Sequence, residues 1–133
     1  MTAKYMLALA AVVLAVGQAR AQGLHVVERL TGYECMALNL SEAELFDFDK
    51  LPPVLSAPRA DAPRIGVASA SVIVASPRRT VGGYVEMLHM DGRSGWVEAG
   101  KLRPWVNRNR PSTRCYPAMM SNGRPGFDYA SSR

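Results

Sequence analysis

The sequence has few of the residues from which metal and cofactor sites are usually built. Its 133 residues include only two cysteines and two histidines. Neither cysteine has a second one nearby, and neither histidine stands at a zinc-ligand spacing from a cysteine. The acidic residues Glu42, Glu44, Asp47 and Asp49 lack the D-x-D-x-D-G loop and closing glutamate of a calcium site. We therefore expect neither a metal ion nor a cofactor.

Long apolar runs are also scarce, and the one that is present lies at the N-terminus. The uncharged run Tyr5–Val16 precedes Ala19 and Ala21, which have the small-x-small spacing of a signal-peptidase site. As a helix, twelve residues rise about 18 Å, which is less than the roughly 30 Å of a bilayer core. We therefore predict a signal peptide over residues 1–21, with cleavage between Ala21 and Gln22; the alternative is an uncleaved anchor. The mature protein would be periplasmic or secreted, with no transmembrane segment.

The two cysteines, Cys35 and Cys115, form the single pair that the sequence allows. In a small exported protein such a pair predicts a disulfide bond, and the alternative is a pair of free thiols or metal ligands. Because an oxidised cysteine cannot act as a nucleophile, the pairing also disfavours cysteine catalysis.

Prolines and turn residues divide the mature chain into three parts. Residues 22–50 are predicted to form an N-terminal arm with a short helix, which starts at a capping box of Ser41 and Glu44 and stops before two prolines. Residues 51–106 contain short alternating or β-branched runs between turns, which predict a small antiparallel β-barrel. Residues 107–133 are rich in proline, glycine, asparagine and serine, and we expect an irregular C-terminal tail tied back by the disulfide.

The strongest local signal is a hairpin near the end of the barrel region. The segment YVEMLHM, residues 84–90, is predicted to be a two-faced strand, with Tyr84, Glu86, Leu88 and Met90 on one face and Val85, Met87 and His89 on the other. Asp91-Gly92 is a tight-turn signal, and Gly92 permits the positive φ that such a turn needs. SGWVEA then gives the return strand, and AGKL is typical of a single 3₁₀ turn.

The segment MDGRSGWVEAGKL, residues 90–102, resembles the signature of bacterial SH3-like (SH3b) domains: a hairpin turn, Gly-Trp-Val, and a short turn ending in leucine. The resemblance covers about 55 residues, from 51 to 105. It implies an SH3-like barrel in which Gly92, Gly95, Trp96 and Val97 are a structural motif, with one of the last two side chains packed inside. It also implies recognition of peptidoglycan or peptides, the usual ligands of this family.

Candidate ligand-binding residues are the aromatic Tyr84 and Trp105 and the basic Arg108 and Arg110. Aromatic-lined grooves bind peptides, although Tyr84, Trp96 and Trp105 could instead be core residues. Residues 28–49 carry a net charge of −5 and residues 99–133 of +6, so we expect the two segments to pair. An anionic envelope polymer is the alternative partner for the arginines. Nucleic acid is not expected, because no recognised binding module accompanies them.

His89 is the candidate for a general base, beside Asp91 in the sequence. A base needs a nucleophile in reach, and Ser94 is expected to face solvent across the hairpin, so we interpret His89 as a surface histidine. These observations favour a non-enzymatic binding module of the bacterial cell envelope, with peptidoglycan or an envelope protein as its ligand. The alternatives are a small secreted enzyme or enzyme inhibitor and a structural envelope protein without a ligand.

Overall fold

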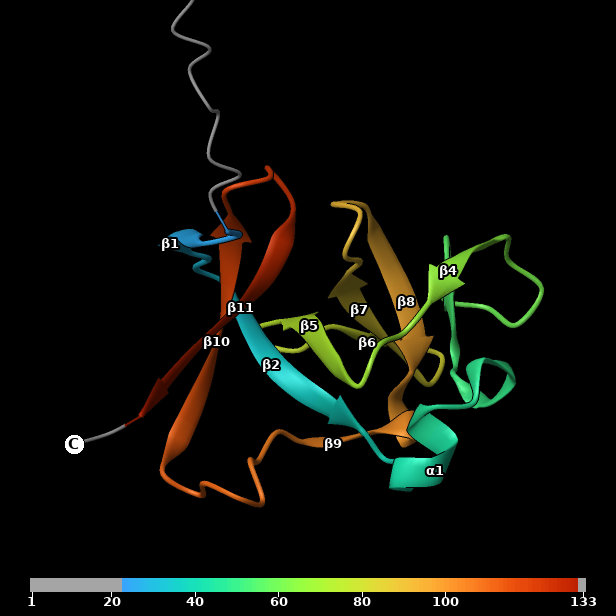
Figure 1. The fold of residues 1–133 in the computed structure, drawn as a ribbon. Helices are drawn as coiled ribbons and strands as arrows, with labels where there is room; N and C mark the ends of the chain where they lie inside the picture. The colour runs from blue at the N-terminus through green and yellow to red at the C-terminus, as the bar shows by residue number, and fades with distance from the viewer. Residues whose placement is uncertain (1–22, 132–133) are drawn as a thin grey trace, which may run out of the picture.

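Eleven strands and three short helical segments lie in residues 23–131, the part of the chain that the computed structural model describes (Figure 1). Every strand pairing among these residues is antiparallel, and the strands form two sheets. The prediction of a mainly β protein with antiparallel sheets is confirmed. The predicted signal peptide and its cleavage point fall outside the described residues.

The larger sheet has eight strands in the order β4-β3-β8-β7-β5-β2-β9, with β6 paired to β7. Its members are β2 (Tyr33–Leu38), β3 (Pro53–Leu55), β4 (Arg64–Val67), β5 (Ser71–Ala75), β6 (Thr80–Val81), β7 (Tyr84–Leu88), β8 (Ser94–Glu98) and β9 (Leu102–Pro104). Within the described residues no pairing joins β4 to β9, so the hydrogen-bonded sheet keeps two edges. The region expected to form a barrel is therefore found as an antiparallel sheet.

The strand β2, which we predicted to be part of an arm, lies inside this sheet. It pairs with β5 on one side and with β9 on the other, so a boundary between residues 50 and 51 separates strands that the structure pairs. Met36, Ala37 and Leu38 are all buried. A strand covered on both faces has a continuous apolar run and no alternation, which is why the sequence pattern did not reveal it.

The C-terminal region differs most from the prediction. The strands β10 (Thr113–Met120) and β11 (Pro125–Ser131) form a hairpin, and β10 also pairs with β1 (Val26–Arg29) to complete a second, three-stranded sheet. The prediction of an irregular tail over residues 107–133 is therefore wrong. The turn residues that supported it close the hairpin: Gly123 has a φ of 76°, and the Met120 N–H donates to the Arg124 carbonyl over 2.9 Å.

The core lies on one face of the larger sheet. Val85, Met87 and Val97 alternate along β7 and β8 and are at most 4% exposed, as the two-faced pattern predicted. The central strand β5 is buried on both faces, because Val72 and Val74 enter this core while Ile73 points the other way.

The helix is confirmed but shorter than its sequence pattern allowed. It is α1 (Glu42–Leu45), and its capping box is present: Glu44 N–H donates to Ser41 Oγ over 3.2 Å, and Ser41 N–H donates to Glu44 Oε1 over 3.1 Å. The second of these bonds holds the pKa of Glu44 below its ordinary value. A 3₁₀ turn, η1 (Phe48–Lys50), follows with Asp47 as its cap. The 3₁₀ turn predicted at AGKL is confirmed as η2 (Ala99–Lys101).

Candidate functional site

The two sheets are joined covalently next to the candidate site. Cys35 in β2 and Cys115 in β10 form the predicted disulfide, with their Cα atoms 6.0 Å apart. Ile73, which is fully buried, stands opposite Cys35 in the β2–β5 register. The smaller sheet therefore approaches the larger one on the face that Ile73 occupies. A disulfide is consistent with an oxidising compartment outside the cytoplasm.

Three aromatic rings form a stack where the two sheets meet, and we call them the aromatic ladder: Trp105, Tyr129 and Phe127. The ring centroids of Trp105 and Tyr129 are 5.6 Å apart, with 24° between the planes. Those of Tyr129 and Phe127 are 6.0 Å apart, with 20° between the planes. Phe127 and Tyr129 are two residues apart in β11, so their side chains lie on the same face of that strand.

Trp105 is held at the base of the ladder. It follows β9 directly, and its indole N–H donates to Ser71 Oγ over 3.0 Å. The polar group of the indole is thus satisfied inside the protein, and the ring is partly buried. Tyr129 is 54% exposed, so it presents the ladder to solvent. Trp105, which the sequence analysis proposed for recognition, is thus the partly buried ring of the ladder. Tyr129, which the sequence analysis did not single out, provides its exposed ring.

Beside the ladder lies a recess of about 400 Å³, which we call the apolar recess. Six apolar residues line it: Leu24, Met90, Met120, Pro125, Phe127 and Tyr129. Asn122 and Arg124, from the β10–β11 turn, supply polar groups at the same site. This volume is in the range of small-ligand sites, which combine apolar walls with a few polar groups.

The structure does not bring the other predicted ligand-binding residues to this site. The β5–β7 register puts Ser71, the partner of Trp105, near the Leu88 end of β7, and Tyr84 is at the opposite end of that strand. Arg108 lines a separate recess of about 270 Å³ together with Glu42. Arg110 is exposed in the loop before β10, where its carbonyl accepts from the Thr113 N–H over 2.9 Å.

The residues of the structural motif lie where the hairpin needs them. Gly92 has a φ of 91° in the turn between β7 and β8. A Cβ atom on Gly95 would lie 2.6 Å from Val54 Cγ1, so β3 packs against bare backbone at this point. Val97 is fully buried, whereas Trp96 is only partly buried and stands opposite Leu55 and Glu86. Val97 is thus the side chain that enters the core.

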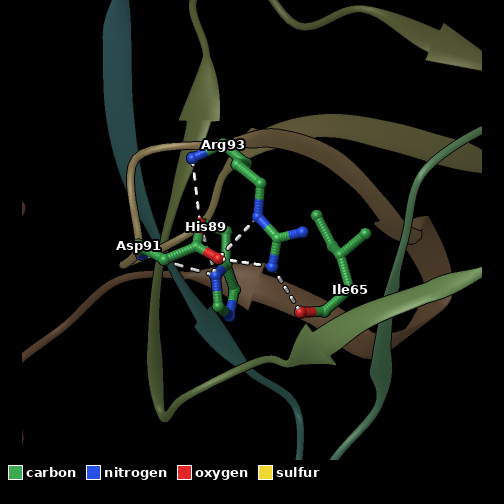
Figure 2. A network of polar contacts seen from close by, with 4 residues as sticks. All are labelled: Ile65, His89, Asp91 and Arg93. Carbon is green, nitrogen blue, oxygen red and sulfur yellow. Dashed lines mark hydrogen bonds and ion pairs between the residues drawn. The ribbon is translucent and has the colours of Figure 1, made fainter.

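The prediction that His89 is a surface histidine is wrong. Its side chain is only 17% exposed, because the ring packs over Gly66 of β4, and Nδ1 lies 2.9 Å from Asp91 Oδ1. Figure 2 shows Arg93 between the Asp91 carboxylate and the Ile65 carbonyl. The Arg93 guanidinium donates to Asp91 Oδ2 over 2.7 Å and to the Ile65 oxygen over 3.0 Å.

This network stabilises the β7–β8 turn and fastens it to β4. The side-chain hydrogen bond from Arg93 is the main cause that holds the pKa of Asp91 well below its ordinary value, and the His89 ring acts in the same direction. His89 and Asp91 are therefore engaged in packing and charge pairing within the hairpin.

The predicted pairing of the acidic arm with the basic tail is met only in part: Arg103 and Arg108 line one recess with Glu42, but no ion pair within residues 23–131 joins a carboxylate of the arm to a cation of the tail. The ion pair that does join these segments has the reverse polarity, from Arg29 Nε to Asp128 Oδ2 at 2.8 Å. Among residues 23–131, no ion pair involves Arg108, Arg110 or Arg124.

Sequence reasoning missed Phe127, Tyr129, Leu24 and Met90. The available signal was the alternation of Phe127 and Tyr129, which the turn-forming composition around them obscured. Within the described residues, no group of three or more histidine, cysteine, aspartate or glutamate side chains could hold a metal ion. None of the helices in the same residues is long and apolar enough to cross a membrane.

Comparison of the chain with protein families, with curated proteins and with solved structures gave no match.

Proposed function

We propose that the protein is an exported, non-enzymatic SH3-like binding module of the bacterial cell envelope, with peptidoglycan or an envelope protein as its ligand. The observation that carries the proposal is the aromatic ladder beside the apolar recess. The ladder presents the exposed ring of Tyr129 to solvent, and the recess offers apolar walls. Surfaces of this kind bind the flat faces of sugars and the side chains of extended peptides.

Charge supports an anionic ligand at this surface. Arg124 lines the apolar recess and makes no ion pair within the described residues. Asn122, from the same turn as Arg124, adds a neutral amide to the lining. Guanidinium groups bind carboxylates with two parallel hydrogen bonds, and the stem peptides of peptidoglycan carry carboxylates. The ladder would then hold the sugar or an apolar side chain while Arg124 holds the acid.

The SH3-like part of the proposal rests on the segment from Met90 to Leu102. Its hairpin turn, buried Val97 and final 3₁₀ turn are the features that the resemblance implies. The larger sheet has short antiparallel strands, as such a fold does, and the disulfide adds a covalent brace that suits an envelope protein.

The test is co-sedimentation of the oxidised protein with purified peptidoglycan sacculi at low and high salt. We expect retention that persists at high salt, and a Tyr129→Ser variant that binds more weakly. One stacked ring contributes roughly 0.5–1.5 kcal/mol beyond its buried area, so the affinity should fall about two- to tenfold.

Tyr116→Ser is the matched control. Tyr116 is a half-exposed tyrosine of the same hairpin, but it alternates with Cys115 and Pro117, which stand opposite Tyr129 and Phe127, and so lies on the other face. It should leave binding unchanged. Retention that is lost at high salt would indicate nonspecific attraction by the arginines. No retention at either salt would contradict peptidoglycan as the ligand and leave the envelope protein.

A further inference from the structure

Two phenylalanines project into solvent where α1 is followed by η1: Phe46 caps the end of α1, and Phe48 is the first residue of η1. Phe46 is 86% exposed and Phe48 is 66% exposed, more than any other large apolar residue among the described ones. We call residues 46–49 the phenylalanine knob. Proteins seldom leave neighbouring aromatic rings in water unless they contact a partner.

The local sequence holds these rings outward. The capping box of Ser41 and Glu44 fixes α1, and Leu45 is the residue of that turn that packs against the core. Phe46 then caps the end of α1, and the Asp49 N–H donates to Asp47 Oδ1 over 3.0 Å to start the next turn. The backbone of the knob is therefore fixed by two consecutive caps, and the two exposed phenylalanines belong to an ordered segment.

The charge around the knob defines the surface that it fits. Asp47 and Asp49 lie within it, Glu42 is one turn earlier, and Lys50 is the neighbouring cation. None of the ion pairs within residues 23–131 involves these three carboxylates. The fitting partner is an apolar recess with a positive rim.

The same protein carries such a recess. The apolar recess has a volume of about 400 Å³, and its lining includes Arg124, which makes no ion pair with any residue from 23 to 131. In Figure 1 the turn between β10 and β11 is at the top of the molecule, and α1 is at the lower right. The knob therefore cannot reach the recess of its own chain, but it can enter the recess of another copy.

We propose that the protein associates head to tail, with the phenylalanine knob of one copy bound in the apolar recess of the next. Such a contact is heterologous: each copy uses a different surface on its two sides, so the association continues instead of stopping at a symmetric dimer. Two aromatic side chains bury about 150–250 Å² each, which is well below the roughly 1,200 Å² of a stable interface, so the contact is weak. The carboxylates of the knob would also face Arg124, an attraction that salt screens. The association should therefore grow with protein concentration and weaken with salt.

The experiment is sedimentation velocity of the oxidised protein over a range of concentrations, with no peptidoglycan present. We expect the mean mass of the wild type to rise with concentration. Phe46→Ser/Phe48→Ser removes the knob and should give a monomer. Leu24→Glu places a negative charge at the recess, where it repels the acidic knob, and should also give a monomer.

The matched control for Leu24→Glu is Val27→Glu. Both residues are 62% exposed, but Val27 does not line the recess, so this variant should associate like the wild type. Val106→Ser, an exposed apolar residue outside the knob, is the control for the phenylalanine variant. Because all these side chains are exposed, circular dichroism should show the same fold in every variant.

A mixture of the two variants tests whether the contact joins the knob of one copy to the recess of another. The knob variant keeps its recess and the Leu24→Glu variant keeps its knob, so an equimolar mixture should form a dimer and nothing larger. A wild type that stays monomeric, a variant that still associates, or a mixture without a dimer would each overturn the proposal. Because no wall polymer is present, these results are separate from the sedimentation test with sacculi.

Discussion

At the scale of single residues, the absence of a side chain at Gly66 determines how β4 packs against the hairpin. A Cβ atom at this position would lie 2.5 Å from His89 Nε2 and 2.9 Å from Cε1. The His89 ring can therefore cover β4 only where there is no Cβ. Its Nδ1 atom is held by Asp91, so the ring is restrained on both sides.

We predict that Gly66→Ala destabilises the protein by about 1–3 kcal/mol, as overpacking commonly does. Chemical denaturation of the oxidised protein measures this change. Gly100→Ala is the control, since an added Cβ would meet nothing within 4 Å there, and it should change the free energy of unfolding by less than about 0.5 kcal/mol. Removing the ring with His89→Ala should largely abolish the effect of Gly66→Ala. An equal effect in both backgrounds would show that His89 is not the residue in conflict.

Few of these residue-scale facts were visible in the sequence. Asp91-Gly92 predicted its turn because positive φ and a short acceptor are local requirements. The burial of His89 depended on Gly66, which is 23 positions earlier in the chain and in another strand. No local pattern reports such a contact.

At the scale of elements, the β7–β8 hairpin is held to β4 by charge as well as by packing. The Asp91 carboxylate accepts from the Arg93 N–H over 2.9 Å and from the Arg93 side chain over 2.7 Å, and Arg93 also donates to the Ile65 carbonyl of β4. Because the pKa of Asp91 is lower in the folded protein than in an unfolded chain, its ionised form stabilises the fold.

The lowered pKa of Asp91 determines how its contribution to stability depends on pH. The stabilisation is fully present above the unfolded pKa of about 3.9 and is lost as the pH falls through the lower folded pKa. We predict that Asp91→Asn destabilises the protein at neutral pH and that the difference from wild type shrinks below about pH 4. Urea denaturation of both proteins at a series of pH values measures this difference in the free energy of unfolding. Asp61→Asn, whose carboxylate forms one exposed ion pair, is the control and should differ little from wild type at any pH.

Elements were predicted well where they are local. The capping box of α1 and the alternation of β7 both appeared as their sequences indicated. The hairpin of β10 and β11 did not, because Pro117, Asn122 and Gly123 are turn or breaker residues in isolation. Pro117 nevertheless lies in the central strand of the smaller sheet, where its carbonyl accepts from the Leu30 N–H over 2.8 Å.

At the scale of the whole molecule, the disulfide between Cys35 and Cys115 joins the two sheets that frame the aromatic ladder. It connects residues 80 positions apart, and its two strands belong to different sheets. The ladder itself crosses the same boundary, because Trp105 follows β9 of the larger sheet and Tyr129 belongs to β11 of the smaller one.

We predict that Cys35→Ala/Cys115→Ala lowers the free energy of unfolding by about 2–5 kcal/mol. The loss should be uneven: amide hydrogen exchange should rise more in β10 and β11 than in β7 and β8, because the smaller sheet loses its covalent link to the core. The reduced wild type, which keeps both side chains, is the control and should behave in the same way. An equal rise in both sheets would show that the bond does not act as a local brace.

The sequence by itself determined the properties that depend on neighbouring residues or on simple counting. One pair of cysteines permits one disulfide, a capping box starts α1, and alternating β-branched residues form antiparallel strands. Only the tertiary structure decided that the C-terminal region forms a second sheet, in which β10 pairs with both β1 and β11. The same packing stacks Tyr129 on Trp105 and leaves the apolar recess beside them.

The physical reason for this division is the range of the interactions involved. Capping, turn geometry and strand alternation act over a few residues, so a short stretch of sequence contains all the partners. The stacking of Trp105 on Tyr129 joins residues that are 24 positions apart, and the burial of β2 needs strands from three parts of the chain. Contacts of that range exist only once the sheets have packed, which is why the candidate site emerged from the fold and not from a motif.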